Sequence, residues 1–241
     1  LNVSNTALKD ITPLKSLLNL RYLYLNNSEI TDIKVIQRMI YLEDLFLNDT
    51  QINDLSPLRY LTNLQYLDIS HTKINRINHL KRLVKLDHLD VSYTPITDIE
   101  TISELTELRH LNLNGTDISD VTPLGKMTRL RFLGLSRTRI NNIKITSQFN
   151  KLSHLDIAET LVSDISSLSH LKHLNELDLF KTPINNIAAL NRKTKMRELN
   201  LGFTTIKDIS VLKNMVNLQK LDLRRVAINN ISVLKNLKKM K

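Results

Sequence analysis

The chain has 241 residues, of which 41% are hydrophobic and 24% are charged, and no apolar run in it is long enough to cross a bilayer. It contains no cysteine, which excludes a disulfide scaffold, a zinc–thiolate site and a thiol nucleophile, and its four glycines leave little material for phosphate-binding loops. The 34 Lys and Arg residues exceed the 24 Asp and Glu residues by ten charges, so a nucleic acid or an anionic surface has to be considered as a partner.

The main feature of the sequence is an internal repeat of 22 residues. From Leu20 onward a large apolar residue recurs at this interval as far as Met240, without insertion or deletion. The chain is therefore a partial repeat over 1–19, ten full repeats over 20–239, and the start of a further repeat at 240–241. Because one unit of this length cannot bury its aliphatic side chains alone, we expect the units to stack as a single domain over 1–241.

Each repeat has two kinds of apolar spacing, counted with Leu20 at position 1. Leucines at positions 4 and 6, such as Leu45 and Leu47, alternate as in a strand with one buried face. Positions 17 and 20, such as Leu58 and Leu61, have helical spacing. In three repeats a hydroxyl residue and a proline come first, and we expect the hydroxyl to cap a short helix or 3₁₀ turn: Thr12-Pro13, Ser56-Pro57 and Thr122-Pro123.

These elements predict an α/β solenoid, a curved array with a parallel sheet on its concave face and short helical or 3₁₀ segments on its convex face. The pattern is almost pure in residues 42–63 (LEDLFLNDTQINDLSPLRYLTN), and its second half recurs in 118–124. It resembles the 22-residue subclass of leucine-rich repeats, found in bacterial internalins and in a regulatory subunit of protein phosphatase 1. The resemblance implies protein binding on the concave sheet and favours a bacterial surface or secreted virulence protein.

Position 9 departs from the family pattern, which usually places Asn there. Here the position holds Ser28 and, in nearly every other repeat, threonine, as at Thr50. A hydroxyl can bond to the turn backbone, and buried polar groups have to be paired. We therefore expect these residues to be structural.

Aromatic residues concentrate on the predicted concave face, where positions 3, 5 and 7 project and positions 2 and 8 flank them. Eight of the eleven aromatic residues lie there, and exposed aromatic patches mark protein-binding surfaces. The alternative is that aromatic residues simply suit strands and pack across neighbours. The candidate protein-binding residues are Tyr22, Tyr24, Phe46, Tyr66, His88, His110, Phe132, Phe180, Phe203 and Arg224, with the first four as the best hot spot.

The charges are distributed unevenly over the repeat. The concave positions carry nine basic and twelve acidic residues, whereas positions 15 to 22 carry 19 basic residues and three glutamates. A groove that held nucleic acid would need the basic residues on the concave side, so a nucleic-acid partner is disfavoured. Along the array the concave face has two basic and six acidic residues in the first five full repeats, then seven and six in the last five.

Four polar side chains could converge as metal ligands on the concave face, namely Asp68, His88, Asp90 and His110. Their spacing matches no metal motif, and no nucleophile elbow or phosphate-binding loop is present, so we expect no metal, no cofactor and no catalysis.

Two residues interrupt the core pattern. Thr146 stands at a core position, and Lys193 replaces an expected leucine, where we expect its stem to cover apolar surface and its ammonium to reach water.

The sequence thus predicts a protein-binding module that acts on a protein ligand through its concave face. Two alternatives remain open, an architectural spacer or stalk, and binding of an anionic surface or nucleic acid by the basic convex face. The ends lack polar caps, so we expect a longer protein or end-to-end self-association. Glycosylation sequons at Asn26, Asn48 and Asn114 fall on the concave face, which favours a bacterial surface, secreted or cytosolic location over a eukaryotic secretory one.

Overall fold

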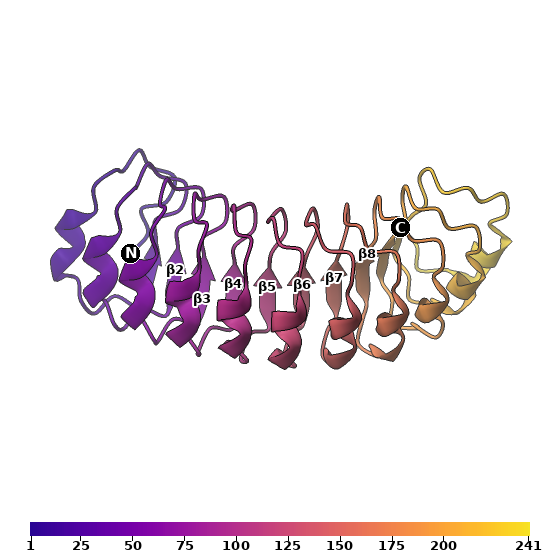
Figure 1. The fold of residues 1–241 in the computed structure, drawn as a ribbon. Coiled ribbons are helices and arrows are strands. Elements are labelled where there is room, and N and C mark those ends of the chain that lie inside the picture. The colour runs from indigo at the N-terminus through magenta and orange to yellow at the C-terminus, as the bar shows by residue number, and fades with distance from the viewer. The chain divides into compact units, whose positions relative to one another are not determined.

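A computed structural model describes residues 1–241 and divides them into two compact units, Leu1–Ile118 (unit 1) and Ser119–Lys241 (unit 2). Each unit is a stack of the same repeat. Within a unit, short strands lie along one side and short helices along the other (Figure 1). This arrangement confirms the predicted leucine-rich-repeat architecture of strand, turn and short helical return.

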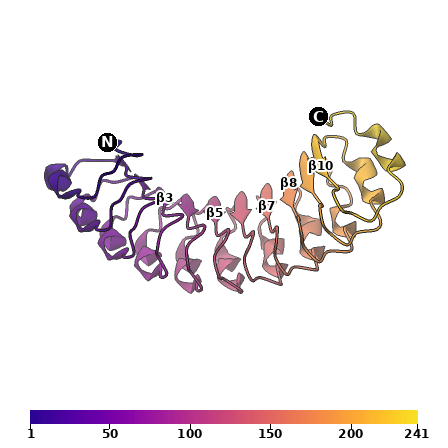
Figure 2. The same ribbon diagram turned by 90° about the horizontal axis from the view of Figure 1, so that it is seen from above.

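Every strand spans three residues at positions 3 to 5 of its repeat, and the strands within each unit run parallel in chain order (Figure 2). Neighbouring strands pair without any slip, so that Tyr22 lies opposite Asp44 and Leu23 opposite Leu45. Side chains at one repeat position therefore form a column across the strands. In unit 1 the strands are β1 (Tyr22–Tyr24), β2 (Asp44–Phe46), β3 (Tyr66–Asp68), β4 (His88–Asp90) and β5 (His110–Asn112). In unit 2 they are β6 (Phe132–Gly134), β7 (His154–Asp156), β8 (Glu176–Asp178), β9 (Glu198–Asn200) and β10 (Lys220–Asp222).

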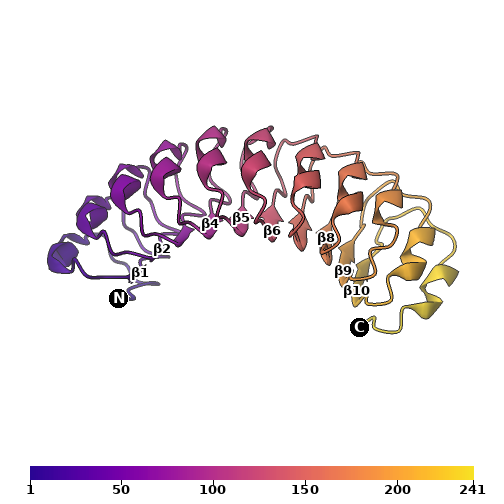
Figure 3. The ribbon, with the colours of Figure 1, turned by 90° about the horizontal axis from the view of Figure 1, so that it is seen from below.

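The return segments are all 3₁₀ helices, and within each unit they lie on the side opposite the strands (Figure 3). None has more than five residues, far short of what a membrane span needs. In unit 1 they are η1 (Thr12–Ser16), η2 (Lys34–Arg38), η3 (Ser56–Tyr60), η4 (Asn78–Arg82) and η5 (Glu100–Glu104). In unit 2 they are η6 (Thr122–Lys126), η7 (Lys144–Gln148), η8 (Ser166–His170), η9 (Ala188–Leu190), η10 (Ser210–Asn214) and η11 (Ser232–Asn236).

The core lies between the strands and the 3₁₀ helices of each unit. Leu45 and Leu47, the strand positions of the pattern, are fully buried, and so are the helical positions Leu58 and Leu61. Burial of each such side chain contributes roughly 1.5–3 kcal/mol. The two apolar spacings therefore point into one core.

The predicted hydroxyl caps are wrong, because the capping group comes from the residue two places earlier. The backbone amide of Ser56 donates to Asp54 Oδ1 at 2.8 Å, and Ser56 Oγ donates to the other carboxylate oxygen at 2.6 Å. The same amide bond joins Thr12 to Asp10 and Thr122 to Asp120. A carboxylate can accept both the amide and the hydroxyl proton, whereas the hydroxyl here has become a donor.

The threonines at position 9 are structural, as predicted. Thr50 is buried, and its hydroxyl donates to the carbonyl oxygen of Leu47 at 2.6 Å. Ser28 makes the equivalent bond to Leu25, also at 2.6 Å. The partner is thus the last core residue of the strand segment, three residues earlier in the same repeat.

Lys193 corrects the expectation that its ammonium reaches water. The residue is only 6% exposed, and Nζ donates to the carbonyl oxygens of Ser169 and Leu171 at 2.9 and 2.8 Å. Burial lowers the pKa of this amine. The adjoining helix η9 has three residues rather than five, so the chain does deviate locally. Thr146, also buried, bonds to Ile143 O at 2.8 Å.

Candidate functional site

In each unit we call the side chains at positions 3, 5 and 7, with 2 and 8 at the margins, the strand face. In unit 1 this face carries a continuous stack of five rings, half-buried and one from each strand β1 to β5. The centroid distances are 4.7 Å from Tyr24 to Phe46, 4.5 Å from Phe46 to Tyr66, 4.0 Å from Tyr66 to His88 and 3.7 Å from His88 to His110. We call these five residues the ring stack.

The ring stack crosses the sheet diagonally. Tyr24 and Phe46 occupy position 5, whereas Tyr66 and the two histidines that follow occupy position 3. Adjacent rings are within 27° of parallel, so their faces cover one another and their edges are left to meet a ligand. The strand face of unit 1 therefore presents an apolar strip of ring edges.

A carboxylate stands beside the ring on each of the strands β2, β3 and β4. The strand pairs are Asp44 with Phe46, Tyr66 with Asp68, and His88 with Asp90. On β2 the acid is at position 3 and the ring at position 5. On β3 and β4 the ring is at position 3 and the acid at position 5. The strip of ring edges is thus flanked by the three carboxylates, which we call the acid row.

Two members of the acid row hold the backbone as well. Asp68 Oδ1 accepts hydrogen bonds from the amide and hydroxyl of Ser70 at 3.0 and 2.7 Å. Asp90 does the same with Ser92 and also accepts from Asn112 Nδ2 at 2.9 Å. This bond from position 5 to the amide at position 7 was not predicted from the sequence. The recurrence of Asp or Asn at position 5 is the signal that could have revealed it.

The acid row lies in a negative field. Burial raises the pKa of Asp44, and so does nearby Glu43. Burial also raises the pKa of Asp68, with Asp90 and Asp49 adding to the effect. In both cases burial is the main cause, and nearby carboxylates add to it, so both acids bind a proton more readily than a free aspartate does.

The same environment acts on two rings of the stack. Burial, with nearby carboxylates adding to it, raises the pKa of Tyr66 to about 12. Burial lowers the pKa of His88 to about 4, although Asp90 opposes the shift. Both rings are therefore neutral at pH 7.

The predicted metal candidates do not form a ligand set. His88 and His110 are stacked face to face, while Asp68 and Asp90 are turned to their serine partners. The structure has no group of three or more His, Asp or Glu side chains arranged to hold a metal ion.

Tyr22 and the margin residues lie outside the ring stack. Tyr22 is 45% exposed, and its hydroxyl donates to Glu43 Oε2 at 3.3 Å. Tyr93 stacks on His71 at 4.6 Å and lies over Gly115, where a Cβ atom would come within 2.6 Å of the tyrosine ring. Of the four predicted hot-spot residues, the structure brings Tyr24, Phe46 and Tyr66 together.

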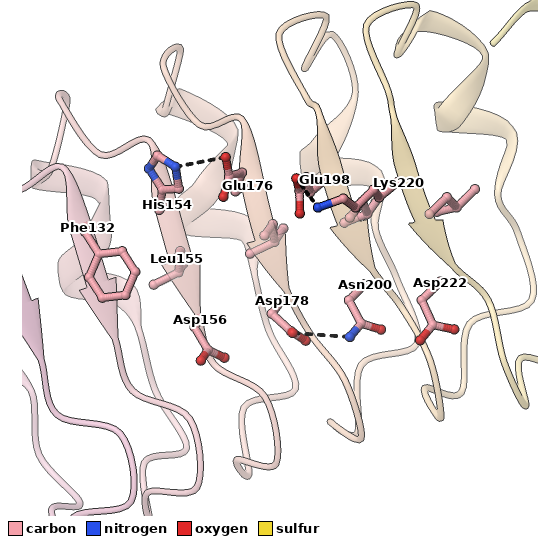
Figure 4. A pocket seen from close by; sticks show the side chains of 13 residues that line it. Phe132, His154, Leu155, Asp156, Glu176, Asp178, Glu198, Asn200, Lys220 and Asp222 are labelled. Carbon is pink, nitrogen blue, oxygen red and sulfur yellow. Dashed lines mark hydrogen bonds and ion pairs between the residues drawn. The ribbon is translucent and has the colours of Figure 1, made fainter. Parts of the chain in front are cut away.

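The strand face of unit 2 is different, since it contains a shallow hollow of about 410 Å³ across β6 to β10 (Figure 4). Its acids are matched by partners from neighbouring strands. Glu176 pairs with His154 at 2.9 Å, and Glu198 pairs with Lys220 Nζ at 2.7 Å. Asp178 accepts from the Phe180 amide at 2.8 Å and from Asn200 Nδ2 at 3.2 Å.

The remaining predicted residues of unit 2 border this hollow in part. Phe132 lines it and lies 6.3 Å from the His154 ring. Phe180 and Phe203 meet edge to face at 5.2 Å, and the guanidinium of Arg224 lies 5.8 Å from the Phe180 ring. Arg224 also pairs with Asp222 at 2.7 Å. These rings form separate contacts and make no stack like that of unit 1.

Comparison with known proteins identifies relatives of the same architecture. A family model of leucine-rich repeats, in two copies, matches residues 42–82 and 84–126. The internalin InlF of Listeria monocytogenes is 28% identical, with a TM-score of 0.83 over 100% of this chain and 84% of that one. Internalin C2 of the same species is 29% identical, with a TM-score of 0.74 over 80% of this chain and 84% of that one.

A leucine-rich repeat protein of Leptospira interrogans shares the fold at 22% identity, with a TM-score of 0.87 over 95% of this chain and 61% of that one. A search by sequence among curated proteins finds no match.

Proposed function

We propose that this leucine-rich repeat protein, which resembles the bacterial internalins, is a non-catalytic module that binds a protein ligand on its strand face. The observation that carries the proposal is the ring stack of unit 1. Five half-buried rings on one sheet face, outside the core, give the large apolar contact that interface anchors provide. The rings hold one another in place, so little side-chain entropy is lost on binding.

The similarity to Listeria internalins supports a bacterial origin and a surface or secreted location. Unit 2 would add contacts through Phe132, which lines its hollow, and through a cluster in which Phe203 and Arg224 both lie against Phe180. These are secondary, because the acids and bases of that region already pair with one another.

The test is a double variant, Tyr24→Ala with Phe46→Ala, compared with wild type in affinity capture followed by titration of the captured ligand. Loss of two central anchors is expected to weaken binding by at least about 2 kcal/mol. The melting temperature should fall only slightly, because both rings lie outside the core.

The matched control is Tyr41→Ala with Tyr60→Ala, since these tyrosines are 54% and 55% exposed and lie outside the strands. The control should bind like wild type. Equal affinity of both double variants would contradict the proposal and favour the spacer function. Binding that is lost only in the control and falls steeply with salt would favour an anionic partner of the helical side.

A further inference from the structure

We propose that the strand face of unit 1 selects a basic segment of its protein ligand, in which Lys or Arg side chains meet the acid row while apolar side chains meet the ring edges. This inference rests on the proposed function and narrows the class of its partner. It is carried by the pairing of one ring with one carboxylate on each of β2, β3 and β4.

The acid row has no cation of its own. The two arginines of this face are already engaged at its margin. Arg21 Nε donates to Glu43 Oε1 at 2.9 Å, and Arg109 Nε lies 3.3 Å from Asp87 Oδ1. The carboxylate of Asp44 has neither a hydrogen bond nor an ion pair, and the bonds to the carboxylates of Asp68 and Asp90 come from neutral donors.

Unit 2 has the same repeat but five acids within its strands, against three in unit 1. There the strand-position glutamates have partners on neighbouring strands, Glu176 with His154 and Glu198 with Lys220. Internal compensation is therefore available to this architecture, and unit 1 uses it for Glu43 and Asp87 at the margin but not for the acid row. A ligand cation can supply the missing partner, and such complementarity decides which partners are accepted.

The protein as a whole is basic. It carries a formal net charge of +10, and twelve of its 24 acids lie at strand-face positions. A basic peptide has little reason to bind elsewhere on such a surface. The acid row and the ring edges together form an apolar strip with a negative border, which fits a segment that combines Lys or Arg with apolar residues.

The experiment is selection of a phage-displayed library of random twelve-residue peptides on the full chain at low salt. Lys and Arg are expected to be enriched about threefold or more among the bound peptides, together with apolar residues. A peptide that emerges is then titrated against the triple variant Asp44→Asn, Asp68→Asn, Asp90→Asn. Loss of three charge contacts should weaken it about tenfold.

At Asp68 and Asp90 the substitution to Asn keeps the acceptor for the backbone amide, and the protein itself has Asn112 and Asn200 at their position 5. The carboxylate of Asp44 holds no backbone amide, so its substitution removes only the charge. The matched control is Asp178→Asn in unit 2. The affinity of this variant for the same peptide should stay within twofold of wild type. Selection of peptides without Lys or Arg, or of none at all, would overturn the inference, and so would equal binding by the triple variant.

Failure here is distinguishable from failure of the proposed function. If the ring variant Tyr24→Ala, Phe46→Ala loses the captured ligand while the triple Asn variant retains it, the strand face binds protein but does not select a basic segment. If the ring variant retains the ligand, the proposed function itself fails.

Discussion

At the scale of single residues, Lys193 is the only charged side chain among the buried residues. Its ammonium has two carbonyl partners and no carboxylate, so its desolvation is incompletely offset. Methionine occupies the same repeat position at Met39, Met127 and Met215. We predict that Lys193→Met raises the free energy of unfolding at pH 7 by about 1–2 kcal/mol, measured by urea denaturation.

The gain should depend on pH in a defined direction. The pKa of Lys193 is lower in the folded than in the unfolded chain, so the unfolded chain binds the proton more readily. Wild-type stability therefore rises as the pH approaches the unfolded value of about 10.4, and the advantage of the variant should shrink between pH 7 and pH 10. An advantage that stays constant over this range would show that the lysine is not desolvated.

At the same scale, the sequence locates both irregular core residues but not what they do. The repeat makes Lys193 visible as a departure, yet the carbonyl groups that receive its ammonium belong to the preceding repeat and depend on the local backbone. The cap was misassigned for a related reason. Ser56 and Asp54 are both of the residue types that cap helices, and only the geometry shows that Asp54 is the acceptor and Ser56 the donor.

At the scale of elements, an Asp or Asn at position 13 precedes every 3₁₀ helix except η4. Position 13 before η4 is Arg76, which cannot accept the amide proton of Asn78. Asn142 fills this role before η7, at 2.8 Å from the Lys144 amide. We predict that Arg76→Asn stabilises the protein by about 0.5–1 kcal/mol in urea denaturation.

The control for this change is Arg76→Ala, which removes the charge without adding an acceptor. It should leave the free energy of unfolding within about 0.5 kcal/mol of wild type. If both variants are equally stabilised, relief of charge repulsion explains the gain and the cap does not.

The ring stack is also a property of elements, and the sequence predicts only part of it. Because the repeat has no insertion, it shows that Tyr24, Phe46 and Tyr66 lie on consecutive strands. It does not show that His88 and His110 extend the stack, since histidine at position 3 is equally compatible with metal binding or hydration. Ring orientation across the sheet requires the coordinates.

At the scale of the whole molecule, acid should act on the fold in two stages. Between pH 6.5 and about 4 the unfolded chain protonates His88 before the folded chain does, so stability declines as the pH falls. Below about pH 4 the capping aspartates take over. Hydrogen bonds hold the pKa values of these aspartates below the ordinary range, and protonation removes the acceptors that cap the helices. The aspartates concerned lie in both units: Asp10, Asp54, Asp120, Asp164 and Asp208.

The first stage can be isolated with His88→Phe, which keeps a ring in the stack but has no titratable group. Asp44 and Asp68 act in the opposite sense, because their raised pKa values let the folded chain take up protons first, and they are present in both proteins. The difference in unfolding free energy between variant and wild type, measured at pH 7, 5.5 and 4, should therefore move steadily in favour of the variant. A difference independent of pH would mean that His88 is not buried in the stack, whereas the decline below pH 4 belongs to the caps and should persist in both.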